Sequence, residues 1–268
     1  TYNDGKSWQK VEGPLSTGFI YSAAVHPKDK CTVYATNGTQ VFKTDDCSRS
    51  WVEMYRESRS DVRLSSLAFD PHAPNRIFLT QTSGDILFSD DGGANWRALA
   101  RLNTIIEQIV PDQHQANTWY LATRVDGIFR SDDGGLTWVS LAEKLGQYSG
   151  GLEYRRFFVH PTKPGILYWI STYGILVSQD RGNSWKAMTL ITPPGSAAIY
   201  GFAVNPKNDN EIYYTTTING RSTFYKSIDG GLNWMTKKIP SDQLPVVLRV
   251  HPAQENIIYL GFTVPPKQ

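Results

Sequence analysis

The sequence predicts an all-β protein built from six repeated four-stranded units, and three observations support this prediction. The motif Ser/Thr-x-Asp-x-Gly-x-x-Trp recurs along the chain, its copies are almost evenly spaced, and β-branched and aromatic segments flank every copy. A period of roughly 40–50 residues is typical of repeat architectures in which each period is one supersecondary unit. Helical periodicity is essentially absent from the 268 residues.

The repeated motif occurs in four complete and two degenerate copies. Its acidic residues are Asp46, Asp91, Asp133, Asp180 and Asp229, and its tryptophans are Trp8, Trp51, Trp96, Trp138, Trp185 and Trp234. The tryptophans are 43, 45, 42, 47 and 49 residues apart. In the degenerate copies Ser48 replaces the glycine and Asn3 replaces the aspartate. Aspartate stabilises turns and glycine accepts a positive φ, so we interpret the motif as a structural turn and not as a metal loop.

The remainder of each period predicts four antiparallel strands, with the motif in the turn between the third and the fourth. A pair such as Asn37-Gly38 separates the second strand from the third, and such pairs favour two-residue hairpin loops. In the first period that loop would pair Thr36 with Thr39. Units of four strands repeated six times predict a β-propeller with six four-stranded antiparallel blades.

On these motifs the chain resembles the Asp-box (BNR-repeat) β-propellers. That family includes sialidases, sortilin-type receptor domains, xyloglucan-cleaving hydrolases and photosystem-assembly factors of the Ycf48 type. The resemblance covers practically the whole chain. It implies that each box aspartate binds backbone N–H groups of its own turn and that the tryptophan packs beneath it. The box identifies the repeat and leaves the function open.

We expect a single propeller domain over residues 1–268, with a terminal blade assembled from residues 246–263 and 1–12. Closure by both termini would remove the open edge that a sheet otherwise exposes. One strand of that blade has no counterpart in the sequence. The alternative is a propeller of seven blades, if residues upstream of Thr1 are missing.

The two cysteines are candidates for a disulfide bond. Cys31 begins the second strand of its unit, and Cys47 lies in a turn at the same end of that unit, so disulfide geometry is reachable. The alternative is a pair of free buried thiols. A disulfide would indicate an oxidising compartment, and we expect an extracytoplasmic protein that is periplasmic, secreted or anchored through an N-terminal segment.

Composition and motifs exclude several functions. A net charge of +2 gives no steering toward nucleic acid, and no apolar run is long enough to span a bilayer. No nucleotide-binding or metalloprotease motif is present, so we expect neither a cofactor nor a metal. His26, His160 and His251 each precede proline at one repeat position, which indicates a turn.

Departures from the repeat mark the candidate partner-binding surface, which we place at the mouth of the propeller channel. Its residues are Arg56, Arg63, Glu107, Arg124, Arg155, Arg156, Tyr173, Tyr200 and Arg249. Arg249 stands where other units have Ala24, Ala68 or Ala203. Arginine suits carboxylates, phosphates and aromatic faces. The alternative is that these are solvated loop charges, with Arg155 or Arg156 paired to Glu107 or Glu153.

Two classes of function fit this surface. We favour a noncatalytic scaffold or assembly factor that binds a protein partner, such as a membrane-associated complex. The alternative is a glycan-binding or glycoside-hydrolysing propeller of the sialidase type. Glycoside hydrolysis needs two carboxyl groups facing each other across a cleft. The sequence offers Glu107, Glu153, Asp61, Asp85 and Asp126 with nothing to pair them.

Overall fold

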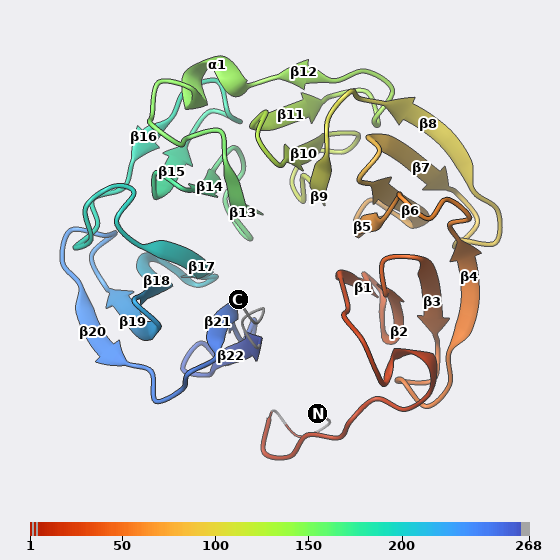
Figure 1. The fold of residues 1–268 in the computed structure, drawn as a ribbon, viewed down its shortest axis with the longest axis horizontal. Coiled ribbons are helices and arrows are strands. Elements are labelled where there is room, and N and C mark those ends of the chain that lie inside the picture. The colour runs from red at the N-terminus through yellow and green to blue at the C-terminus, as the bar shows by residue number, and fades with distance from the viewer. Residues whose placement is uncertain (2, 4, 264–268) are drawn as a thin grey trace. The chain divides into compact units, whose positions relative to one another are not determined.

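The computed structural model describes residues 1, 3 and 5–263. Within that part of the chain it contains 22 strands, one short α-helix and one 3-10 helix, which confirms the all-β class. Five sheets have four antiparallel strands each and a sixth has two (Figure 1). The chain divides into two compact units. Unit 1 holds Thr1–Asp112, Ala116–Thr123 and Arg130–Trp138, and unit 2 holds Gln113–Gln115, Arg124–Phe129 and Val139–Gln268.

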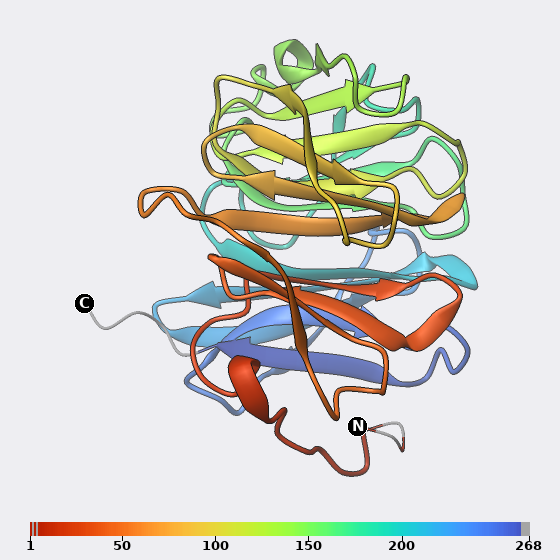
Figure 2. The same ribbon diagram turned by 90° about the vertical axis from the view of Figure 1, so that its right-hand side faces the viewer.

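Unit 1 contains two complete sheets, each a meander in chain order (Figure 2). The 3-10 helix η1 is Gly13–Leu15, and the strands are β1 (Ser22–His26), β2 (Asp29–Thr36), β3 (Gln40–Thr44), β4 (Val52–Arg56), β5 (Leu64–Asp70), β6 (Ala73–Gln81), β7 (Asp85–Ser89) and β8 (Arg97–Arg101). The core includes Tyr34, Val41, Leu64, Leu67 and Ile77, to which both sheets contribute. All seven residues of β5 are buried, because this strand is covered on both faces.

A third sheet shares its strands between the two units, in the order β12-β11-β10-β9. Its strands are β9 (Ile106–Pro111), β10 (Trp119–Thr123), β11 (Ile128–Ser131) and β12 (Val139–Ser140). In β10 all five residues are buried, including Trp119 and Tyr120. Such continuous burial is typical of a strand covered on both faces of its sheet.

Unit 2 contains two four-stranded sheets, the two-stranded sheet and the helix α1 (Ala142–Leu145). The strands are β13 (Tyr154–Val159), β14 (Leu167–Ser171), β15 (Ile175–Ser178), β16 (Lys186–Ala187), β17 (Ala198–Asn205), β18 (Asn208–Ile218), β19 (Arg221–Ser227), β20 (Met235–Lys238), β21 (Leu244–Val250) and β22 (Ile258–Thr263). Aromatic residues fill the core: Tyr168 packs on Phe202, and Tyr214 stacks on Tyr225 with ring centroids 4.3 Å apart.

The first hairpin differs in register from the sequence-based expectation. Thr36 pairs with Val41, and not with Thr39, so the loop is longer than two residues. The Asn37 carboxamide oxygen accepts the backbone N–H groups of Thr39 and Gln40, and this side-chain turn replaces the expected two-residue loop.

Within the described residues the terminal sheet is smaller than the other five. β21 and β22 form a two-stranded sheet, and residues 1, 3 and 5–12 contain no strand. The expected contribution of residues 1–12 to this blade, and the single domain over residues 1–268, stay predictions. No helix within residues 1, 3 and 5–263 has the length and apolar character needed to cross a bilayer.

Candidate functional site

The Asp boxes share the hydrogen bonds around their carboxylate, which the box at 131–138 illustrates. The indole bond varies, since Trp138 and Trp185 donate to the box glycine whereas Trp234 donates to the Thr189 carbonyl. The Ser131 hydroxyl donates to Asp133 Oδ1 at 2.7 Å, and the Gly135 N–H donates to Ser131 Oγ at 2.8 Å. Asp133 Oδ1 also accepts the Thr137 N–H at 2.9 Å, and the Trp138 indole N–H donates to the Gly135 carbonyl at 3.0 Å. The same hydroxyl–carboxylate bond forms at Asp46, Asp91, Asp180 and Asp229. Each carboxylate therefore holds its own turn closed.

The glycine at the motif position of each complete box lies against the preceding sheet. An added Cβ would meet the Tyr34 ring at 3.2 Å from Gly93, and Phe78 and Leu99 at 3.0 Å from Gly135. From Gly182 it would meet Leu141 at 2.6 Å, and from Gly231 Met188 at 3.4 Å. The box glycines therefore leave room for side chains of a neighbouring blade, in addition to adopting a positive φ.

Replacing Asp133 by alanine should lower the free energy of unfolding by about 1 kcal/mol at neutral pH, because the carboxylate is exposed and its bonds compete with water. Hydrogen bonds from Thr137 and Ser131 lower the pKa of Asp133 to about 2 from an ordinary 3.8. The stabilisation is therefore present above pH 3.8 and is lost as the pH falls toward 2. Urea titrations at pH 7, 4 and 2 should show that the difference in free energy of unfolding between wild type and Asp133→Ala becomes smaller as the pH falls. A difference that stays constant would contradict this account.

Other repeated side chains also close turns. The Nδ1 atoms of His26, His160 and His251 accept backbone N–H groups of the residues that follow them, as the sequence indicated. A disulfide bond joins Cys31 to Cys47 in the sheet of β1 to β4. Within the described residues, no group of three or more His, Cys, Asp or Glu side chains is arranged to hold a metal ion.

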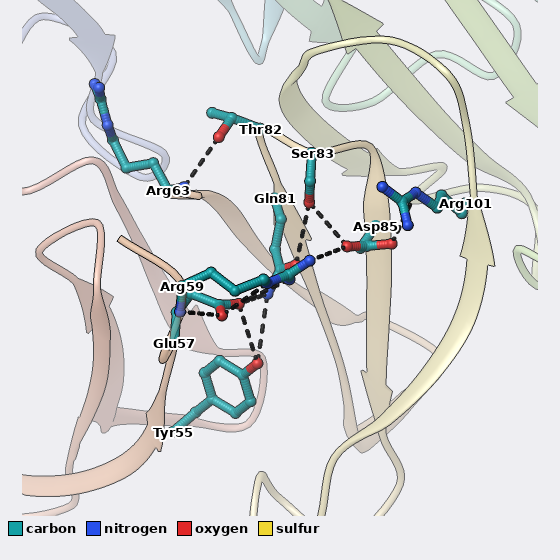
Figure 3. Close-up of polar contacts among 9 residues, drawn as sticks. All are labelled: Tyr55, Glu57, Arg59, Arg63, Gln81, Thr82, Ser83, Asp85 and Arg101. Atoms are coloured by element: carbon teal, nitrogen blue, oxygen red, sulfur yellow. Dashed lines mark hydrogen bonds and ion pairs between the residues drawn. The ribbon is translucent and has the colours of Figure 1, made fainter. Parts of the chain in front are cut away.

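A dense polar cluster lies where β4 leads into β5, and we call it the Arg59 cluster: Tyr55, Glu57, Arg59, Gln81, Ser83 and Asp85 (Figure 3). The Glu57 side chain is only 3% exposed. Arg59 Nε donates to Glu57 Oε1 at 3.0 Å, and its Nη2 donates to Glu57 Oε2 at 3.0 Å. Gln81 Nε2 donates to Glu57 Oε2 at 2.6 Å. Bonds from Arg59 lower the pKa of Glu57 to about 2, against the opposing effect of burial.

The same guanidinium also binds the turn between β6 and β7. Arg59 Nη1 lies 3.0 Å from Asp85 Oδ2, and Arg101 Nε lies 3.4 Å from Asp85 Oδ1. The Ser83 hydroxyl donates to Asp85 at 2.8 Å. Both carboxylates of the cluster are thus engaged by arginine, and the cluster fixes the segment at residues 57–63 to the sheet of β5 to β8.

Arg63 differs from Arg59, because its side chain points away from the cluster (Figure 3). Its backbone N–H donates to Thr82 Oγ1 at 2.9 Å. Its guanidinium lies over the Tyr21 ring, 5.2 Å from the centroid, and Nη1 donates to the Tyr21 hydroxyl at 3.3 Å. Arg63 is exposed, and no salt bridge joins it to a carboxylate among the described residues. Phe19 and Ile20, which precede Tyr21, are 73% and 45% exposed.

The structure places the other predicted residues on several elements. Arg56 ends the outer strand β4 and forms two hydrogen bonds with Glu53, so its charge is already compensated. Glu107 is half-buried on β9, and Arg124 follows β10 with its carbonyl accepting the Tyr154 N–H. Tyr200 lies at a register shift in β17.

Tyr173 lines a cavity of about 390 Å³ in unit 2. Its ring packs on Tyr148 with centroids 4.9 Å apart. The cavity wall is mostly apolar and comprises Tyr173, Gly174, Ile175, Ala187, Met188, Thr189, Leu190, Ile191, Thr192, Pro193 and Pro194. This volume lies within the range of small-ligand sites, yet only Tyr173 and two threonines offer polar side chains.

Three predicted arginines remain in unit 2. Arg155 and Arg156 lie on β13, where Arg155 occupies a register shift, and both are half-buried. Arg249 is exposed on β21, with its guanidinium 5.2 Å from the centroid of the Phe158 ring. Within the described residues none of the three forms a salt bridge with a carboxylate. The expected partner Glu153 instead accepts the Thr172 hydroxyl at 2.7 Å.

Sequence reasoning missed the partners in the Arg59 cluster and left Arg59 off the predicted surface. Glu57, Gln81 and Ser83 come from a strand end and a hairpin turn that are distant in sequence, so no local pattern joins them. The one sequence signal was an acidic residue two positions before an arginine in the long connection between β4 and β5.

The blades, the box turns and the absence of long helices in the described chain define an Asp-box β-propeller. A family model described as "Sortilin, neurotensin receptor 3" matches residues 1–100. A probable oligoxyloglucan-reducing end-specific xyloglucanase of Neosartorya fischeri is 26% identical over 229 residues, which cover 81% of this chain and 23% of that protein. The chain thus spans about a quarter of the length of this curated relative.

Solved structures show the same fold. The GH74 xyloglucanase from Xanthomonas campestris superposes with a TM-score of 0.70 at 20% identity, over 91% of this chain and 43% of that one. YCF48 from Cyanidioschyzon merolae superposes with a TM-score of 0.57 at 16% identity, over 87% of this chain and 88% of that one. The GH74 xyloglucanase and YCF48 therefore share this fold although their names indicate different proteins. The similarity establishes architecture alone.

Proposed function

We propose that this chain is a noncatalytic binding propeller that docks a protein partner through the surface around Arg63 and Tyr21. One observation carries the proposal. The Arg59 cluster anchors the connection to β5, and Arg63 at the end of that connection is exposed on the Tyr21 ring without a carboxylate partner in the described chain. Tyrosine and arginine are enriched among the residues that dominate protein interfaces. Phe19 and Ile20 add exposed apolar surface next to them.

The electrostatics support binding more than hydrolysis. A glycosidase acid needs a carboxyl group whose pKa is raised, so that it stays protonated near neutral pH. Among the described residues, the carboxyl groups with a displaced pKa are all shifted downward: Asp29, Asp46, Glu53, Glu57, Asp91, Asp133, Glu143, Asp180, Glu211 and Asp229. Asp85, which the sequence offered as a candidate, is held by two arginines.

The compartment we propose is extracytoplasmic, and the Cys31–Cys47 disulfide supports it. Structural disulfides persist in oxidising environments and are rare in reducing ones. A membrane-associated complex is one class of partner available there.

Replacing Arg63 by glutamate should weaken capture of the partner about tenfold or more, because a central cation becomes an anion. The melting temperature should change little, since only the contact with Tyr21 is lost. The measurement is affinity capture by the tagged chain from membrane and soluble fractions of the source organism, with quantitative mass spectrometry. Arg49→Glu is the matched control, because Arg49 is exposed in the Asp-box turn between β3 and β4, in the same unit as Arg63. Equal capture by both variants would contradict the proposal.

The second candidate function is glycan binding or hydrolysis, and the similarity to the xyloglucanase across 81% of this chain favours it. Its site would be the cavity at Tyr173, or carboxylates completed by residues outside this chain. Purified protein should be incubated with xyloglucan oligosaccharides and the products followed by chromatography. Cleavage that survives Arg63→Glu and stops on substitution of Glu107 or Glu153 would replace the scaffold proposal.

A further inference from the structure

Arg156 and Arg249, on two first strands of unit 2, lie close to each other, because Arg156 shares a face of its strand with Phe158, whose ring Arg249 covers. Arg155 and Arg156 belong to β13 and Arg249 belongs to β21, and each strand begins its own sheet. The intervening strand β17 packs against both β13 and β21. Arg249 reaches past β17, since its guanidinium lies 5.2 Å from the ring centroid of Phe158 on β13.

Arg249 and Phe158 interrupt the repeat at the same position. In each sheet the residue at this position of the first strand pairs with an aromatic residue on the second; the residues are Ala24, Ala68, Val110, Phe158, Ala203 and Arg249. Alanine or valine satisfies the packing in four of the six. The blades therefore do not require an arginine or a phenylalanine here.

The positive charge of this group has no counter-charge within the described chain. Arg156 Nη1 donates to the Arg155 carbonyl at 2.7 Å, and Arg249 Nη1 donates to the Leu248 carbonyl at 3.0 Å. These bonds and the Phe158 ring orient the two guanidinium groups and leave further N–H groups of each unused. Desolvation and, after it, repulsion from Arg156 lower the pKa of Arg249, although its side chain is open to solvent.

We propose that Arg156 and Arg249 bind the carboxylates of an acidic peptide segment. The planar fork of arginine matches a carboxylate with two parallel hydrogen bonds, and stacking on Phe158 keeps the guanidinium edge available. A peptide fits better than an acidic sugar, because within residues 1, 3 and 5–263 strand β13 pairs only with β14 and strand β21 only with β22. Each strand thus has an edge unpaired in its sheet that an extended chain can use. The inference rests on the proposed function, since it names the chemistry of the partner.

The test uses fluorescein-labelled hexaglutamate as the probe, with hexaglutamine as the neutral counterpart, in fluorescence anisotropy titrations. Wild type should bind hexaglutamate, more weakly as salt rises, and should not bind hexaglutamine. Arg249→Ala and Arg156→Ala should each weaken binding roughly tenfold or more, the effect expected for a hydrogen-bonded charge pair. Arg249→Ala keeps the residue type of the equivalent positions, so it should fold normally. Arg221 is exposed at the start of β19 in the same unit, so Arg221→Ala should bind as wild type does.

Hexaglutamate binding that is equal in wild type, Arg249→Ala and Arg156→Ala would overturn the site. Binding of oligogalacturonate in place of hexaglutamate, with loss in the same variants, would overturn the peptide and assign the site to an acidic sugar. Partner capture that depends on Arg63 and not on Arg249 would leave the proposed function standing and overturn this inference. If Arg249→Ala abolishes hexaglutamate binding and no partner depends on Arg63, this inference stands and the proposed function is overturned.

Discussion

Replacing Gly84 by alanine is expected to destabilise the protein by about 3 kcal/mol or more, the largest effect we predict. Gly84 has φ +88°, and an added Cβ would lie 1.8 Å from the Leu102 carbonyl oxygen and 2.9 Å from that of Thr104. Both obstacles are backbone atoms, so relief requires the whole segment to move. Overpacking costs about 1–3 kcal/mol and a left-handed non-glycine residue about 1–2 kcal/mol. Denaturant unfolding followed by tryptophan fluorescence measures the loss.

Gly220→Ala is the matched control for this variant. Gly220 occupies the corresponding hairpin turn between β18 and β19 with φ +74°, and an added Cβ would meet nothing within 4 Å. Only the backbone conformation is then strained, and a less flexible unfolded chain offsets part of that strain. Gly220→Ala should therefore lower the free energy of unfolding by about 1 kcal/mol or less. Equal losses at the two glycines would show that the approach of Leu102 contributes nothing.

Replacing Arg59 by alanine should cost about 2–3 kcal/mol, because it leaves the Glu57 carboxylate buried without its cation. This value lies at the lower end for buried pairs, since Arg59 itself is 43% exposed and water can take part of its place. The pKa of Glu57, about 2 in the wild type, should rise in the variant. Wild-type stabilisation from this carboxylate is present above its ordinary pKa of 4.5 and is lost as the pH falls toward 2. The difference between the proteins should therefore shrink in acid.

Two further variants isolate the buried charge in the Arg59 experiment. Arg56→Ala removes an arginine from the neighbouring, exposed pair with Glu53 and should cost about 0–1 kcal/mol. In the Arg59→Ala background, Glu57→Gln removes the unpaired charge and should recover part of the loss. A double variant less stable than Arg59→Ala would show that the carboxylate is tolerated without its arginine.

The blades could be predicted from the sequence because their determinants are local. A box turn is closed by atoms within a few residues of Asp133, and the strand segments repeat with the same period. The Arg59 cluster could not be predicted in this way, since Gln81 reaches Glu57 across 24 residues. Only the packing of two sheets brings them together. The predicted register of the first hairpin was wrong, because the Asn37 side chain, and not the Asn-Gly pair alone, determines its turn.

The candidate surface shows the same contrast. Departures from the repeat drew attention to Arg249, which stands at a position where three other sheets have alanine. They could not distinguish Arg56, which Glu53 compensates, from Arg63, which lies on Tyr21. That distinction depends on which neighbours each long side chain reaches. The sequence shows where the arginines stand along the chain. The packing determines which of them keep N–H groups that no other residue uses.

The box glycines place a constraint on how such a chain can change in evolution. Gly93, Gly135, Gly182 and Gly231 each receive a side chain from the blade before them, so every turn is also one half of a joint. A change of length within a strand or a box turn would displace one half of a joint, whereas the connecting loops can differ in length, as the uneven spacing of the tryptophans shows. Duplication or loss of a whole period, 42 to 49 residues between tryptophans, keeps every joint matched. Whole blades can therefore be added or lost without disturbing these contacts, and a new ligand surface can arise by exchanging the loops between them.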